Sequence, residues 1–411
     1  MSKRIVRVYC VIRFMYGLSI AFFFATYVIF LTGAGLDLFE VNLINAIFMI
    51  TNFLMEVPTG IVADVYGRKR SLVLSCFVTS LALFVYFISD SFWFFALAEV
   101  VAAIGHSLCS GAFKAWMVDE VNATSEGFDI RRAYRAGKFS DCSGILIGGV
   151  VGGYIGQTNI ALPWLASSVL LFVTGIVAIL IMKELAWQKK EENERSYKLM
   201  FKTLKFGISL CKTSPALVFV MSLGFVWGFA LMPFNMYWQP RFKVFGLEVY
   251  QLGWMYFGIV LMVMLGAVLS AYVFQVFKSN KRSIFFTFCL LAFGMLMSAW
   301  ANTLSFGLIM FYIHEIARGM YEPLLDDYLN KRIESGVRAT ILSFYSMLTT
   351  FGAFWGLLVS GQIAKHYSIE SAWTFSGIIV ILFVLFFILK GVKNEKKIFF
   401  KEGIRKRVQK S

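Results

Sequence analysis

Charged residues are scarce in this chain of 411 residues: Asp, Glu, Lys and Arg make up 15% of it, and hydrophobic residues make up 59%. Soluble domains carry about a quarter charged residues, so an ordinary soluble fold is excluded. The chain also has 6 prolines, so few of its helices are forced to break. This composition predicts an all-α protein that crosses a membrane several times.

Cysteine pairs are also missing, because the 6 cysteines are scattered and form no Cys-x-x-Cys motif. None falls in a predicted external loop, so we expect no disulfide, no metal site and no cofactor. The sequence contains no long external loop and no glycine-rich phosphate loop, which argues against a membrane enzyme such as a lipid-modifying transferase. It also shows no soluble signalling domain of the kind that a transporter-like sensor would carry.

Positive charge is abundant, and its distribution is uneven. The net charge is +15, which by itself would allow a nucleic-acid partner. Of the 39 Lys and Arg, 34 lie at predicted cytoplasmic positions. The other five lie on the predicted external side (Arg241, Lys243 and Lys365) or within spans (Lys114 and Arg318). This asymmetry is the positive-inside pattern. It predicts a multi-pass protein of the cell (inner) membrane with both termini in the cytoplasm, and it argues against nucleic acid.

Membrane-length apolar runs divide the chain, since a span needs ~20 apolar residues. The predicted spans are twelve: 9–31, 41–63, 71–89, 92–118, 138–157, 161–182, 216–239, 251–277, 283–302, 304–326, 339–364 and 371–390. The longest polar interruption lies between the sixth and seventh spans and carries eight basic and four acidic residues. Either a helix on the inner leaflet or a plain solvated linker fits it. The expected organisation is an N-terminal six-helix bundle at 1–182, a cytoplasmic linker at 183–212, a C-terminal six-helix bundle at 213–390 and a basic tail at 391–411.

The two halves of the sequence repeat each other in the same direction. At an offset of 211 residues, Tyr16-Gly17 matches Trp227-Gly228, and Gly35-Leu36-Asp37 matches Gly246-Leu247-Glu248. At an offset of 208 residues, the matched pairs are His106 with His314, Asp119 with Asp327 and Gly148 with Gly356. Constant offsets over several spans are not expected by chance. A parallel repeat of six spans is typical of one transporter architecture.

A short loop separates the second span from the third. Its sequence is Gly60-Ile-Val-Ala-Asp64-Val-Tyr-Gly67-Arg68-Lys-Arg70. Three consecutive basic residues at a membrane edge indicate a cytoplasmic anchor. The spacing Gly-x-x-x-Asp-x-x-Gly-Arg-Lys-Arg also resembles the signature loop of the major facilitator superfamily, although Val65 stands where that family usually has a basic residue.

This resemblance implies two pseudo-symmetric six-helix bundles, a substrate site between them and alternating access. It also implies a charge latch on the cytoplasmic side. The residues that match or neighbour the latch are Gly60, Asp64, Gly67, Arg68, Lys69, Arg70, Asp119 and Arg338. The alternative for this stretch is a topology anchor without a role in transport.

Glycines form a regular stripe on the fifth span. They are Gly144, Gly148, Gly149, Gly152 and Gly153. Small residues at this spacing let helices pack closely. The stripe also resembles the antiporter motif of the drug-efflux branch of the superfamily, with Gly149 in place of the usual proline. That resemblance implies drug:proton exchange, and packing alone is the alternative.

Ionisable residues inside spans are costly in lipid and are functional candidates. The candidates for proton coupling are Glu56, Glu99, His106, Glu315, Arg318 and Glu322. Glu56 lies eight residues before Asp64, so ~12 Å from the cytoplasmic edge at the helical rise. Helical spacing lets Arg318 pair with either Glu315 or Glu322. Each candidate has a structural alternative, namely a hydrogen bond to a neighbouring helix or a static ion pair.

Aromatic and polar side chains in the spans offer a surface for flat apolar or cationic compounds. The cavity candidates are Tyr27, Trp227, Asn235, Trp238, Gln239 and His314. Lipid contact or helix packing is the alternative for most of the aromatic residues. We predict a monomeric secondary active transporter that couples efflux of a drug-like hydrophobic or amphipathic compound to protons. The alternative is a symporter or facilitator for a small metabolite.

Overall fold

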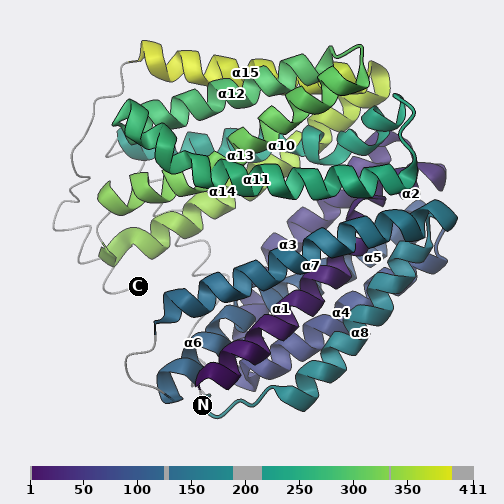
Figure 1. Ribbon diagram of the computed structural model, residues 1–411, viewed down its shortest axis with the longest axis vertical. Coiled ribbons are helices and arrows are strands. Elements are labelled where there is room, and N and C mark those ends of the chain that lie inside the picture. The colour runs from purple at the N-terminus through teal and green to yellow at the C-terminus, as the bar shows by residue number, and fades with distance from the viewer. Residues whose placement is uncertain (1, 125–128, 188–214, 333–334, 391–411) are drawn as a thin grey trace. The chain divides into compact units, whose positions relative to one another are not determined.

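The computed structural model in Figure 1 describes residues 2–124, 129–187, 215–332 and 335–390. The side chains of Ser2, Val57 and residues 335–340 lie outside this description. All regular secondary structure in the described residues is helical. The predicted basic tail and most of the predicted linker, from residue 188 onward, are not part of the described chain.

The chain divides into two compact units. The first unit contains helices α1 to α8 together with Phe242–Phe257. The second unit contains α10 as far as Arg241 and the described chain from Gly258 onward. The end of α10 and the first turns of α11 therefore belong to the first unit.

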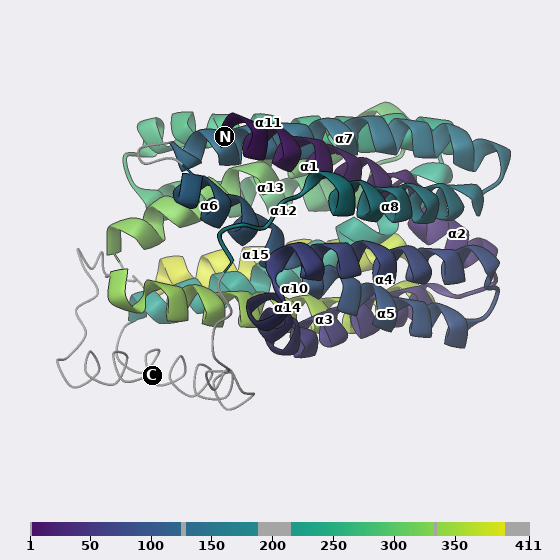
Figure 2. The same cartoon turned by 90° about the horizontal axis from the view of Figure 1, so that it is seen from below.

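The first unit contains eight helices within the described residues. Its helices are α1 (Ser2–Phe24), α2 (Tyr27–Gly33), α3 (Leu38–Tyr66), α4 (Arg68–Ile88), α5 (Phe92–Ser110), α6 (Ala112–Thr124), α7 (Ile130–Thr158) and α8 (Leu162–Ile181). Helix α1 lies along α7, α4 lies between α5 and α8, and α3 packs on α5 (Figure 2).

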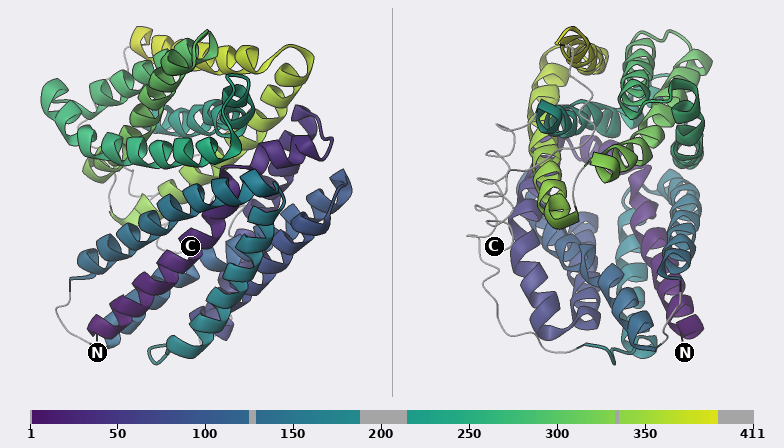
Figure 3. Two further views of the ribbon diagram at one scale, coloured as in Figure 1. Left: turned by 45° about the vertical axis from the view of Figure 1, so that its right-hand side comes forward. Right: turned by 90° about the vertical axis from the view of Figure 1, so that its left-hand side faces the viewer.

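The second unit is made of six helices within the described residues. Its helices are α10 (Pro215–Lys243), α11 (Val249–Phe277), α12 (Asn280–Ala299), α13 (Leu304–Arg332), α14 (Ser335–His366) and α15 (Ile369–Leu389). Helix α12 contacts both α13 and α15. These helices belong to the half of the chain coloured from green to yellow in Figure 3.

Most of these helices suit a membrane. Eleven helical stretches in the described residues are long and apolar enough to cross one, and one of them, Phe92–Thr124, runs through α5 and α6. Helix α13 is the remaining predicted span. It is less apolar because it carries His314, Glu315 and Arg318.

Two predicted spans are each divided into two helices. The span at 9–31 breaks between α1 and α2, where the main-chain N–H and the hydroxyl of Thr26 both donate to the carbonyl of Phe23, at 2.9 and 3.1 Å. A bond to the carbonyl three residues back tightens the turn and ends the α-helical pattern. The span at 92–118 breaks at Gly111, between α5 and α6.

The internal repeat predicted from the sequence recurs in helix packing. Gly148 of α7 lies against the carbonyl of Leu18 on α1, and Gly356 of α14 lies against the carbonyl of Phe229 on α10. The glycines match at the offset of 208 and the carbonyls at 211. A β-carbon at either glycine would overlap the carbonyl oxygen, so both contacts need a residue without a side chain.

The turns before α3 and α11 also match. Gly35 and Gly246 have φ angles of +92° and +87°, which favour glycine. After each turn the third helical residue reaches back to the capping residue. The N–H of Asp37 donates to Glu40 at 2.9 Å, and the N–H of Glu248 donates to Gln251 at 2.8 Å.

Candidate functional site

The loop between α3 and α4 is a single residue, Gly67, with a φ angle of +102°. This left-handed conformation strains any residue with a β-carbon. A β-carbon there would also lie 2.6 Å from Oε2 of Glu184. Gly67 is therefore required both by its backbone conformation and by its neighbour.

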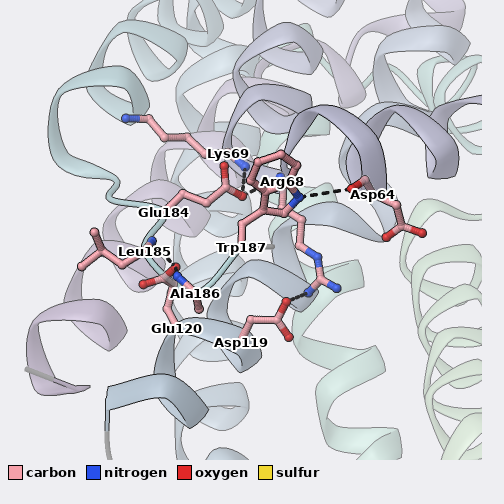
Figure 4. Close-up of polar contacts among 9 residues, drawn as sticks. All are labelled: Asp64, Arg68, Lys69, Asp119, Glu120, Glu184, Leu185, Ala186 and Trp187. Atoms are coloured by element: carbon pink, nitrogen blue, oxygen red, sulfur yellow. Dashed lines mark hydrogen bonds and ion pairs between the residues drawn. The ribbon is translucent and has the colours of Figure 1, made fainter. Parts of the chain in front are cut away.

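The basic residues after this glycine have different partners. Arg68 forms an ion pair with Asp119 of α6 at 2.5 Å (Figure 4). The ammonium of Lys69 donates to the carbonyls of Ile179 and Met182 at the end of α8, at 2.8 and 2.6 Å. Arg70 is exposed. Two of the three basic residues thus join the α3–α4 loop to α6 and α8.

The chain that follows α8 returns to this loop. Oε1 of Glu184 accepts from the main-chain N–H groups of Arg68 and Lys69, at 2.6 and 3.0 Å. The indole N–H of Trp187 donates to the main-chain carbonyl of Asp64 at 3.2 Å (Figure 4). The first residues of the predicted linker are therefore bound to α3 and α4.

Glu184 and Trp187 were not among the predicted site residues. The available signal was an acid directly after an apolar span, at the membrane edge that also carries the basic loop. One predicted latch position, Gly60, stands apart from these contacts. No described atom lies within 4 Å of a β-carbon built at Gly60. Arg338 lies in α14, and its side chain falls outside the described residues.

Glu99 of α5 lies in the interior of the first unit, with 5% of its surface exposed. Its Oε1 accepts hydrogen bonds from the hydroxyls of Tyr27 at 2.7 Å and Tyr86 at 2.6 Å. The ring of Trp164 stacks on that of Tyr86 with centroids 4.1 Å apart. Residues of α2, α4, α5 and α8 thus surround one buried carboxyl group.

The other candidates of the first unit lie on a different surface, where α3 faces α5. His106 is exposed, and its Nδ1 lies 2.9 Å from Oδ1 of Asn52. Glu56 is exposed one turn beyond Asn52 on α3. The structure brings Glu56 and His106 to the same pair of helices and places Glu99 in the core, although the spacing of seven residues predicts a common face for Glu99 and His106.

A second buried carboxyl group lies in the second unit. Glu315 is 1% exposed, and its two oxygens lie 3.2 Å from Nδ1 of His314 and 3.1 Å from Arg318. Arg318 also donates to Oδ1 of Asn235 at 3.0 Å. Glu322 is exposed, and no ion pair within the described residues joins it to Arg318. Of the two pairings allowed by helical spacing, the structure contains Arg318 with Glu315.

The predicted cavity residues differ in exposure. Trp227 and Asn235 are half-buried, and the ring of Trp227 stacks on Tyr321 with centroids 3.9 Å apart. The hydroxyls of Tyr321 and Tyr345 are 2.7 Å apart. The other predicted cavity residues are buried within helix packing, namely Tyr27, Trp238, Gln239 and His314.

The glycine stripe of α7 has two faces. Gly144, Gly148 and Gly152 lie against main-chain carbonyls of α1, and Gly149 and Gly153 lie against the first turns of α11, all within the first unit. Residues four apart lie on one side of a helix, so two interleaved sets of glycines serve two neighbours. Within the described residues, no group of three or more His, Cys, Asp or Glu side chains is arranged to hold a metal ion.

The fold and these sites define a membrane transporter with repeated halves. A model of the Major Facilitator Superfamily matches residues 9–356, and the chain belongs to this family. It is a multi-pass membrane protein with the all-α major facilitator fold, and it is a transporter and not an enzyme.

The relatives and solved structures agree with this assignment. The uncharacterized MFS-type transporter YxaM of Bacillus subtilis (strain 168) is 22% identical over 390 residues, which are 93% of this chain and 95% of the relative. The nucleoside transporter NupG has a TM-score of 0.80 and 13% identity, over 95% of this chain and 100% of that one. A D-xylose-proton symporter has a TM-score of 0.74 and 13% identity, over 96% of this chain and 99% of that one. At such identities the two solved structures show the fold alone.

Proposed function

We propose that this transporter exports a hydrophobic or amphipathic compound in exchange for protons by alternating access. The observation that carries proton coupling is the buried carboxyl group of Glu99, bonded by Tyr27 and Tyr86. A carboxyl group in a membrane protein is retained at such a cost when it has a function. Efflux is supported by the glycine stripe of α7, which resembles the antiporter motif.

Glu99 can gain or lose a proton without breaking an ion pair. Both of its hydrogen-bond donors are neutral hydroxyls that bond the same oxygen, Oε1. When the group is ionised, these two bonds stabilise the charge. When it is protonated, a hydroxyl can rotate and accept instead, because a tyrosine hydroxyl both donates and accepts. The site therefore suits a proton that is bound and released in each cycle.

Glu56 and His106 extend this proposal toward the predicted cytoplasmic side. His106 contacts Asn52, and Glu56 lies one turn away on the same helix. We assign them to proton transfer between water and the interior. The α3–α4 loop, with Arg68 bound to Asp119, serves as the first-unit part of a cytoplasmic latch.

Symport or facilitated uptake of a small polar metabolite is the second candidate. It is favoured by the second unit, where half-buried Asn235 and Arg318 offer hydrogen-bond donors beside Glu315. Solved structures of similar fold include a nucleoside transporter and a D-xylose-proton symporter. The two candidates differ in the direction of net transport and in the polarity of the compound.

Accumulation of ethidium, a flat aromatic cation, by energised cells tests the direction. Cells with the transporter are expected to hold less ethidium than cells without it, and a protonophore should abolish the difference. Cells with the Glu99→Gln variant should accumulate as much ethidium as cells without the transporter. Cells with the control variant Asp90→Asn, which changes an exposed acid between α4 and α5, should accumulate as little as cells with the wild type. Higher accumulation with the transporter, lost on adding the protonophore, would establish uptake and exclude efflux.

A further inference from the structure

The segment Met182–Trp187, here called the strap, follows α8 and is bound closely to the first unit. The indole N–H of Trp116 donates to the carbonyl of Lys183 at 2.9 Å. The main-chain N–H groups of Leu185 and Ala186 both donate to Oε1 of Glu120, at 2.7 and 2.8 Å. Glu120 is 2% exposed, so its carboxyl group is available to the strap and hardly to water. A simple tether between two bundles would need none of these bonds.

Glu184 supplies a cap that α4 lacks. The first N–H groups of a helix have no partner within the helix, and the helix dipole favours a negative charge beside them. The capping residue of α4 is Gly67, which has no side chain and makes no side-chain cap. Oε1 of Glu184 accepts from the N–H groups of Arg68 and Lys69 instead. Because the turn requires glycine, the cap must come from another segment.

The strap also restrains the other side of the turn. Trp187 bonds the main-chain carbonyl of Asp64 in the last turns of α3. Lys69 bonds the carbonyls of Ile179 and Met182 at the end of α8, where the helix dipole favours a positive charge. The turn is thus bound to the strap by contacts before Gly67 and after it, in addition to its ion pair with Asp119.

We propose that Glu184 is a positioning residue of the latch, which holds the turn at Gly67 so that Arg68 reaches Asp119, and that the strap and the α3–α4 loop move as one body. This role does not depend on the substrate or on the direction of transport. It makes the strap part of the gating machinery.

Hydrogen exchange of the full chain in lipid nanodiscs tests this role without a substrate. Glu184→Ala removes both hydrogen bonds, so exchange of the peptide covering residues 64–72 should rise about tenfold or more. Glu184→Gln keeps an acceptor without the charge and should give a smaller rise. The matched control is Asp129→Asn, because Asp129 caps α7 by accepting from the N–H of Arg131 at 3.0 Å. This control should affect the start of α7 alone.

Unchanged exchange at residues 64–72 in Glu184→Ala, or an equal rise in all helices, would overturn the proposal. If Glu184→Ala does not fold, Glu184→Gln and Trp187→Phe give the same test, since each removes one part of the interaction and should still raise exchange locally.

A double-mutant cycle separates positioning from simple stabilisation. If Glu184 places Arg68 against Asp119, then Asp119→Asn should lower the unfolding temperature less in the Glu184→Ala background than in the wild type. Additive effects of the two substitutions would show that Glu184 stabilises α4 without positioning Arg68, and the proposed role would be wrong.

Discussion

Glu99 in the first unit and Glu315 in the second are both buried, but their carboxyl groups have different partners. Glu99 in the first unit accepts bonds from two neutral tyrosine hydroxyls. Glu315 in the second unit lies between His314 and the guanidinium of Arg318. The first carboxyl group can change its charge without leaving a charged neighbour unpaired. Protonation of the second would leave Arg318 without its counter-charge.

This difference separates two roles that the sequence placed in one group of candidates. A buried ion pair is costly to break, so Glu315 and Arg318 are suited to hold the second unit together or to bind a polar substrate group. A carboxyl group among hydroxyls is suited to bind and release a proton. The comparison makes Glu99 the preferred site of proton coupling.

The largest expected effect is on the stability of the second unit. Arg318→Gln removes the guanidinium that pairs with the buried carboxylate of Glu315 and should lower the free energy of unfolding by about 3 kcal/mol. The double variant Glu315→Gln with Arg318→Gln removes both charges and should recover most of that loss. Thermal unfolding in detergent measures both. A double variant as unstable as the single one would show that the ion pair is not what Arg318 contributes.

A smaller loss of stability, equal in the two units, is expected when the equivalent glycine contact within each unit is disturbed. Gly148→Ala and Gly356→Ala each place a β-carbon against a main-chain carbonyl, and each should cost about 2 kcal/mol of stability. Gly60→Ala is the matched control, because no described atom lies near its β-carbon position. Clearly unequal costs for the two glycines, measured by thermal unfolding, would contradict the packing equivalence of the halves.

Removal of the tyrosine hydroxyls should affect the first unit more mildly. Tyr86→Phe keeps the ring stacked on Trp164 and loses a bond to Glu99, which should cost about 1.5 kcal/mol if Glu99 is ionised. Tyr27→Phe should cost a similar amount. Tyr367→Phe, whose side chain is 80% exposed, should have no effect in the same unfolding assay. No loss of stability in Tyr86→Phe would indicate that the hydroxyl does not stabilise the carboxyl group.

The smallest effect on stability is expected at the latch. Asp64→Asn keeps the main-chain carbonyl that binds Trp187, so unfolding should change by less than about 0.5 kcal/mol. The transport rate should fall, because the carboxylate is the proposed acid of the latch. Dye efflux and thermal unfolding of the same variant measure the two quantities. Wild-type transport by Asp64→Asn would reduce the loop to a topology anchor.

Much of the fold follows from the sequence because membrane spans and repeats leave strong patterns. The runs of apolar residues locate the helices, and the glycine pairs at constant offsets indicate the parallel halves. The helix break at Thr26 was not predictable, because it depends on local hydrogen bonds to the carbonyl of Phe23 and not on a proline or glycine. The polarity of α13 was visible in the sequence, and its ion pair was one of two pairings that helical spacing allows.

The site residues that lie in one local sequence motif were predictable from the sequence. Those contributed by a distant segment of the chain were not. Gly67 and Arg68 were identified from the loop motif, but Glu184 is more than a hundred residues away in the sequence, so no local pattern connects it to the loop. The second half illustrates a further limit. Its counterpart of the loop lacks the glycine, yet Lys278, at the offset of 211 from Gly67, also has a positive φ angle, +48°. The turn is retained although the residue that favours it is lost.

The most direct test of proton coupling compares Glu99 and Glu315 in inverted membrane vesicles. The vesicles are energised, a panel of hydrophobic and amphipathic compounds is added, and compound-driven proton release is recorded for the wild type, Glu99→Gln, Glu315→Gln, Glu56→Gln and the control Asp90→Asn. We predict that Glu99→Gln reduces this release to the level of vesicles without the transporter and that Asp90→Asn retains it. Compound-driven proton release by Glu99→Gln equal to that of the wild type would contradict the account.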